Sequence, residues 1–196
     1  MSLLERTVSW DQLVRWGALR MYPEKQVRAW FGDGPDLTVD RVLAIGTKAP
    51  RVYWTVLRPE VVPDSVLHLV AHALCSDLLD RLEEEGAYLD FRLRVGLDHK
   101  LRWIRGGCTS GELAHHQRQA DRAQVDVAEH PTGAADATLA ASAVRSALDL
   151  DGSEAFKGVF FTVVDRFDDD RQRRAIHARV RSTLADPGAA AAQETP

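Results

Sequence analysis

The stretch "VLHLVAHALC" carries three side chains that bind metals, and their spacing is helical. His68, His72 and Cys75 are separated by four and then three residues, so in a helix they share one face. Zinc is bound by neutral imidazole nitrogens and thiolate sulfurs at about 2.0 to 2.3 Å. The spacing therefore allows a zinc site, provided that another segment supplies at least one further ligand.

The alternative is a core helix that happens to carry two imidazoles. Leu69 follows His68 where a zincin helix has its catalytic glutamate, so the base of that chemistry is missing. Buried histidines commonly hydrogen-bond to backbone carbonyls or carboxylates instead. We favour the core helix and expect no cofactor, with zinc as the metal that these residues would bind if the alternative were correct.

Three weaker candidates follow in "GGCTSGELAHH". Glu112 and His115 form one Glu-x-x-His step, but a di-iron bundle needs two such steps and two more glutamates. Cys108 precedes a helix start, where amide N–H groups would lower the pKa of its thiol and favour nucleophilic attack. A positioned base is also needed. For Glu112 and His115 we favour a solvated helix face, and for Cys108 a small residue in a turn.

Amphipathic periods separated by Gly and Pro organise the chain. The connections are short, which predicts antiparallel helices packed as neighbours. Ser9 and Gln12 are placed to form a capping box at the first helix, and Thr109 or Ser110 can cap a later one. The expected helices cover 10–20, 24–31, 37–46, 63–85, 88–107, 110–130, 133–150, 153–167 and 168–186.

The segment 63–85 is apolar nearly all round, which predicts a central helix. Segments 88–97 and 157–164 are also compatible with strands because their apolar residues alternate or are β-branched; we favour helix for both. The sequence thus predicts a single all-α domain over 1–185 of about eight to ten helices, either a multi-helix bundle or a short helical solenoid. Residues 186–196 are expected to form a disordered tail.

Composition excludes several classes of protein. The 25 basic and 29 acidic residues give a net charge of −4 and concentrate neither sign, so a nucleic-acid-binding module is not expected. Two cysteines are too few for a disulfide framework. No apolar run approaches about 18 residues, and the first residues do not form a signal peptide. We expect a cytoplasmic protein that binds neither nucleic acid nor membrane.

Five stretches together resemble a group of all-helical bacterial proteins that are labelled as immunity proteins. They are "WDQLVRWGA", "VRAWF", "APRVYWTVL", "HLVAHALC" and "LRWIRGGCTSGEL". The resemblance covers about residues 10–125. It implies a helical fold and a protein partner, and it transfers no catalytic residues.

Two functional hypotheses follow. The first is a non-enzymatic cytosolic protein that binds a macromolecular partner, a protein or peptide, one form of which is an immunity protein. The second is a helical enzyme, or a small-ligand or metal-binding protein of the kind encoded in biosynthetic clusters. Its pocket would be lined by His68, His72 and Cys75, with Cys108, Glu112 and His115 as further contributors, because clustered titratable groups in a buried site often mark function.

Overall fold

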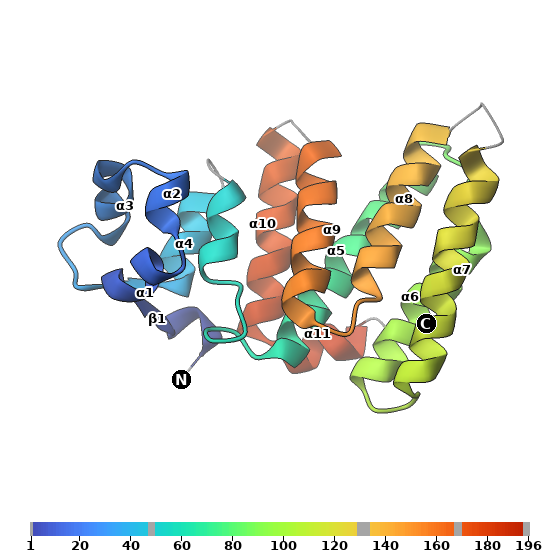
Figure 1. Ribbon diagram of the computed structural model, residues 1–196, viewed down its shortest axis with the longest axis horizontal. Coiled ribbons are helices and arrows are strands. Elements are labelled where there is room, and N and C mark those ends of the chain that lie inside the picture. The colour runs from blue at the N-terminus through green and yellow to red at the C-terminus, as the bar shows by residue number, and fades with distance from the viewer. Residues whose placement is uncertain (1, 47–49, 129–133, 167–169, 194–196) are drawn as a thin grey trace.

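The computed structural model describes residues 2–46, 50–128, 134–166 and 170–193, and these are almost entirely helical. The all-α prediction is confirmed. Figure 1 shows the helices side by side in a row, with α1 to α4 at one end and the α6–α7 pair at the other. The α-helices are α1 Trp10–Arg15, α2 Ala18–Met21, α3 Glu24–Phe31, α4 Val39–Gly46, α5 Asp64–Glu84, α6 Phe91–Ile104, α7 Ser110–Ala128, α8 Ala134–Ala147, α9 Gly152–Arg166, α10 Asp170–Ala185 and α11 Pro187–Gln193.

The N-terminal end of the row contains a short strand pair that the sequence did not predict. Strands β1 (Thr7–Ser9) and β2 (Asp36–Thr38) are antiparallel, and the buried Val8 lies opposite the buried Leu37. Each strand is too short to show an alternating pattern. Their pairing therefore depends on the helices between them, which return the chain to its start.

Helix α1 ends earlier than expected. The predicted helix over 10–20 is divided at Gly17, whose φ of 88° is left-handed. A glycine adopts this conformation without steric cost, so it ends one helix and lets the next begin in a new direction. The predicted capping box is present, with Ser9 Oγ accepting from the Gln12 N–H at 3.3 Å.

The N-terminal end attaches to the row through the 3₁₀-helix Pro50–Thr55 (η2); a second 3₁₀-helix, η1, covers Leu3–Glu5. The Tyr53 hydroxyl lies 2.9 Å from His177 Nδ1 on α10. The Tyr53 ring packs edge-on against Phe160 of α9, with centroids 5.0 Å apart. Burial raises the pKa of Tyr53 above its usual value, so the phenol stays protonated in the folded protein.

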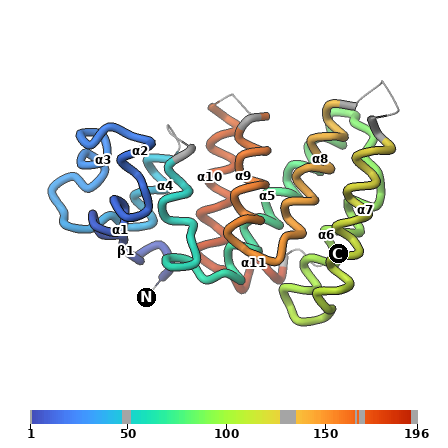
Figure 2. The backbone as a smooth tube through the Cα atoms, in the orientation of Figure 1, coloured from blue at the N-terminus to red at the C-terminus, as the bar shows by residue number. Residues whose placement is uncertain are grey.

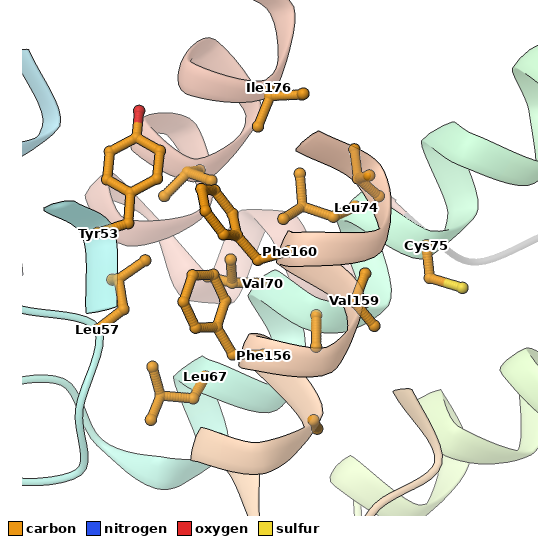
Figure 3. Close-up of a cluster of buried hydrophobic side chains, with 14 of the residues drawn as sticks. Tyr53, Leu57, Leu67, Val70, Leu74, Cys75, Phe156, Val159, Phe160 and Ile176 are labelled. Carbon is orange, nitrogen blue, oxygen red and sulfur yellow. The ribbon is translucent and has the colours of Figure 1, made fainter. Parts of the chain in front are cut away.

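Helix α5 is the centre of the molecule, as predicted. It packs against α6, α8, α9 and α10. Figure 3 shows the α5 side chains of Leu67, Val70 and Leu74 in one cluster with Phe156 and Phe160 of α9. Because all five side chains are buried, this cluster forms the core on one side of α5.

Both ambiguous segments are helical. Segment 88–97 falls largely within α6 and segment 157–164 falls within α9. In α6, Leu93 and Leu97 are buried whereas Phe91 and Val95 are exposed. Residues four apart thus share a side of the segment, whereas residues two apart do not. A helix has this pattern, but in a half-buried strand residues two apart would share one side.

The C-terminal segment forms a helix where the sequence predicted a disordered tail. Helix α11 begins at Pro187, and the Asp186 carboxylate accepts the Ala189 N–H at 2.9 Å. Proline at the first helical position and an aspartate cap stabilise a helix start. Helix α11 also packs against α5 and α10, which the polar and alanine-rich sequence did not reveal. None of the described helices is long and apolar enough to cross a membrane.

Candidate functional site

The stripe of His68, His72 and Cys75 lies in the interface between α5 and α6. His72 Nε2 is 3.1 Å from the Leu97 carbonyl oxygen, to which it donates a hydrogen bond. The His68 ring packs edge-on against Trp103 at a centroid distance of 4.9 Å. Cys75 is fully buried, and in Figure 3 its sulfur points away from Phe156 and Phe160. The stripe therefore contacts the face of α6 that is turned toward the core.

These three residues do not converge on one point. His68 Nε2 lies 3.2 Å from the Asp64 carboxylate, whereas His72 Nε2 is directed at the Leu97 carbonyl. Within the described part of the chain, no group of three or more His, Cys, Asp or Glu side chains is arranged to hold a metal ion. Each imidazole has a packing role, and a ligand role for the stripe stays a prediction.

Lys100 is the residue of this interface that sequence reasoning missed. Its side chain has 0% exposure. Its Nζ donates a hydrogen bond to the Asp149 backbone carbonyl and lies 4.3 Å from the centroid of the Trp103 ring. Burial lowers the pKa of Lys100 to about 7, and the carboxylates of Asp149 and Asp64 oppose this. In the sequence, the helical spacing of Lys100 from Leu93 and Leu97, both of which are buried, could have predicted its burial.

Lys100 also acts on the histidine beside it. Burial lowers the pKa of His68, the positive charge of Lys100 lowers it further, and Asp64 opposes both effects. The amine and the imidazole are therefore both biased toward their neutral forms. Such groups can act as bases or nucleophiles. Here Lys100 has no solvent exposure and His68 only 2%, so in this conformation no solute reaches them.

Lys100 and His68 belong to a junction between four helices. The Asp64 carboxylate at the start of α5 accepts the Gly152 N–H at the start of α9, at 2.9 Å. A Cβ on Gly152 would lie 2.5 Å from that carboxylate oxygen, so the contact requires glycine. Asp151 accepts the Glu154 N–H at 3.0 Å as a helix cap. Lys100 thus joins α6 to the turn between α8 and α9, and Asp64 joins α5 to it.

Glu112 and Cys108 have structural roles at the start of α7. Glu112 Oε2 accepts from the Thr109 N–H at 2.7 Å, and Thr109 Oγ1 accepts from the Glu112 N–H at 3.2 Å. Thr109 is therefore the cap, one of the two residues predicted for it, and Glu112 completes a capping box. The Cys108 thiol donates to the His99 carbonyl at 3.4 Å.

The pKa of the Cys108 thiol shifts in the direction opposite to the one that nucleophilic attack would need. Burial raises the pKa of the thiol and the Glu112 carboxylate raises it further, whereas Arg102 opposes them. The negative capping carboxylate lies close to the thiol and disfavours the thiolate, an effect that the position before a helix did not reveal. A raised pKa leaves less thiolate for nucleophilic attack.

His115 belongs to a cluster of three imidazoles that crosses from α6 to α7. The rings of His99 and His116 lie 3.8 Å apart, and those of His115 and His116 lie 5.3 Å apart. Burial lowers the pKa of His116, with repulsion from His99 and His115 adding to it and Glu112 opposing it. The His115–His116 pair is visible in the sequence, but the approach of His99 depends on how α6 packs on α7.

A second surface lies on the other side of α6, and we call it the outer face. Tyr88, just before α6, is 88% exposed, Phe91 is 74% exposed and Val125 on α7 is 62% exposed. The outer face consists of one exposed stripe from each helix, with Tyr88 at its edge: Phe91, Val95, Asp98 and Arg102 on α6, and His115, Arg118, Arg122 and Val125 on α7, with His99 half-buried beside them.

Contacts between the two helices show that these stripes are adjacent. Arg92 Nη2 lies 2.5 Å from the Asp126 carboxylate, which places the start of α6 beside the end of α7. Figure 2 traces the two helices as a hairpin at the end of the row, and α8 packs against both of them on the side toward the core. The side chains of Arg118 and Arg122 form no ion pair or hydrogen bond with any described residue.

Comparisons with models of known protein families, with curated proteins and with solved structures found no match for this chain. The inference of function therefore starts from the geometry of the two sides of α6.

Proposed function

We propose that this chain is a binding protein that acts by holding a macromolecular partner, a protein or peptide, on its outer face. The observation that carries this proposal is the exposure of Tyr88 and Phe91 beside Val95 and Val125 at one end of the helix row. Exposed apolar residues that cluster in this way mark interaction sites more often than scattered ones do.

The energetics favour a partner on this surface. Burying one large apolar side chain contributes about 1.5 to 3 kcal/mol, and aromatic residues are enriched among those that dominate binding. Tyr88 and Phe91 are almost fully available for such burial. The inner face of α6, in contrast, is already covered by α5 and α8.

The form of this function that we favour is an immunity protein, whose binding neutralises a toxin. The support is the resemblance of five stretches between residues 10 and 125 to proteins with that label. A partner of this kind is commonly encoded by the adjacent gene. A neighbouring gene for a biosynthetic enzyme would contradict the immunity form.

Co-expression with the product of the neighbouring gene tests the proposal. We expect a complex that survives gel filtration, with a dissociation constant below about 1 μM. The double variant Tyr88→Ser with Phe91→Ser should weaken it at least tenfold while unfolding at the same urea concentration. Met21→Ser, at an exposed apolar residue of α2, is the matched control. Equal affinity of the double variant and the control would contradict the proposal.

A second candidate function is supported by Lys100 and His68. A cavity of about 360 Å³ lies between α7, α8 and α9, and its lining includes Asp149, whose carbonyl binds Lys100. The remaining lining is mostly polar, which suits a small polar ligand. In this alternative, an opening of the α8–α9 turn would bring the neutral amine of Lys100 to the cavity.

Reductive methylation with formaldehyde and a borohydride distinguishes the two candidates. Lys157, which lines the same cavity and is half-buried, serves as the internal control within the same sample. For a binding protein, mass spectrometry should find Lys157 modified and Lys100 protected in the folded chain. Modification of Lys100 at the rate of Lys157 would favour the small-ligand function.

A further inference from the structure

We infer that the segment of the partner that docks on the outer face is acidic and carries apolar residues toward one end. This inference rests on the proposed function and specifies the chemistry of the partner. It follows from how charge and apolar area are distributed along α6 and α7.

The outer face is basic although the chain as a whole is not. Its two stripes contain Arg102, Arg118 and Arg122 against the carboxylate of Asp98, with the exposed Glu112 one turn before His115, whereas the net charge of the chain is −4. The nearby Asp126 is already paired with Arg92. A negatively charged partner would therefore gain attraction to Arg118 and Arg122 without displacing an ion pair.

The apolar residues lie at one end of the face. Phe91 is the first residue of α6 and Val125 is near the end of α7, and the Arg92–Asp126 ion pair brings these ends together. Arg102 lies eleven residues beyond Phe91, which is about 16 Å along a helix. A docking segment of about three helical turns would cover this length, with apolar residues over Phe91 and acidic residues over the arginines.

A protein segment fits this surface better than a nucleic acid does. The apolar end includes the rings of Tyr88 and Phe91, on which a base could stack, but Val95 and Val125 beside them are aliphatic and offer no such platform. Asp90 and Asp126 flank the same end and share a single cation, Arg92, so these three side chains keep one net negative charge that would repel a phosphate backbone. An acidic peptide places its apolar side chains there and its carboxylates elsewhere, so it avoids this repulsion.

Selection from a displayed library of random 12-residue peptides, with the full chain as the target, tests this inference. We expect the selected peptides to be enriched in Asp and Glu together with apolar residues. Their binding should weaken at least tenfold in Arg118→Glu with Arg122→Glu and in Phe91→Ser. It should also weaken between 50 and 300 mM salt, because the screening length of exposed charges falls from about 14 Å to about 6 Å over this range.

Matched controls and alternative outcomes keep the test decisive. Arg20→Glu and Met21→Ser, both at exposed positions of α2, should leave binding unchanged. Selected peptides that lack acidic residues, or that bind the outer-face variants as tightly as the wild type, would overturn the inference, whereas the proposed function is decided by the co-expression experiment. Tighter binding of a 30-nucleotide poly(dT) strand, lost in the same variants, would overturn it in favour of a nucleic acid.

A selection that returns no peptide above background would also overturn the inference. The co-expression experiment then decides the proposed function separately, because it uses a folded partner and does not require a linear segment.

Discussion

Helix α6 carries polar residues on both sides, and each side uses them differently. Toward the core, Lys100 is fully buried, and the backbone of Leu97 accepts a hydrogen bond from His72. On the outer face, Asp98 and Arg102 are open to solvent. Lys100 is the type of residue that normally lies outside. The comparison shows that in this protein the side of the helix, more than the residue type, decides whether a polar group supports folding or remains available for binding.

The largest expected contrast is between truncations on the two sides of α6. Leu97→Ala should lower the free energy of unfolding by about 3 kcal/mol because it leaves a cavity in the core. Phe91→Ala should change it by less than about 0.5 kcal/mol because the ring is already in water. Urea unfolding followed by circular dichroism measures both. A cost above about 1 kcal/mol for Phe91→Ala would mean that the outer face also supports the fold.

The buried Lys100 should make stability depend on pH. Its pKa is about 7 in the folded protein against 10.5 without the fold, so between these values the unfolded chain binds more protons. The free energy of unfolding therefore rises with pH in this window. From pH 7 to pH 10, the advantage of Lys100→Met over the wild type should shrink by about 3 kcal/mol.

The difference between the two proteins is the quantity to measure, because groups such as Tyr53 titrate equally in both and cancel. Lys100→Arg is a useful companion variant, since a guanidinium cannot become neutral. It should be destabilised at every pH. A difference in stability between Lys100→Met and the wild type that does not change with pH would show that Lys100 is charged in the fold.

His72→Ala tests the role of the α5 stripe. The substitution removes the hydrogen bond to the Leu97 carbonyl and leaves a cavity where the buried ring was, which together should cost about 2 kcal/mol. A chelator should not change the melting temperature of the wild type if the imidazole serves the interface alone. A chelator-dependent drop that disappears in His72→Ala would instead identify the stripe as a metal site, since a structural metal contributes to folding directly.

The smallest effect is expected for the imidazole cluster. The pKa of His116 is lowered in the fold. When the pH drops below the ordinary pKa of histidine, the unfolded chain therefore binds a proton at His116 more readily than the folded chain does. Stability should then fall as the pH drops below about 6.5, by less than about 0.5 kcal/mol at this partly exposed site. His116→Gln should remove this part of the dependence. An NMR titration that places His116 above 6.5 would contradict it.

The central helix could be predicted because its signal is local. Segment 63–85 is apolar nearly all round, and the structure places one side of it on α9 and the His68 side on α6. The capping boxes at Ser9 and Thr109 were predictable for the same reason, since each involves residues three apart. Periodicity also located α6 and α9, but not which of their residues are exposed.

The parts that were missed depend on long-range contacts. The pKa of Lys100 is lowered by burial, and its amine binds a carbonyl 49 residues away. The approach of His99 to His116 requires two helices to pack. The β1–β2 pair joins Val8 to Leu37. Helix α11 is a different case, because its capping residue and proline were visible and the alanine-rich composition was interpreted as a tail.

The division between the two sides of α6 can be tested directly by modifying histidines with diethylpyrocarbonate and mapping the products by mass spectrometry. His115 is exposed on the outer face, whereas His68 and His72 are 2% and 4% exposed. In the folded protein, His115 should react fully while His68 and His72 stay protected, and in urea all three should react alike. Modification of His68 or His72 at the rate of His115 in the folded protein would contradict the account, because the inner side of α6 would then be open to a ligand.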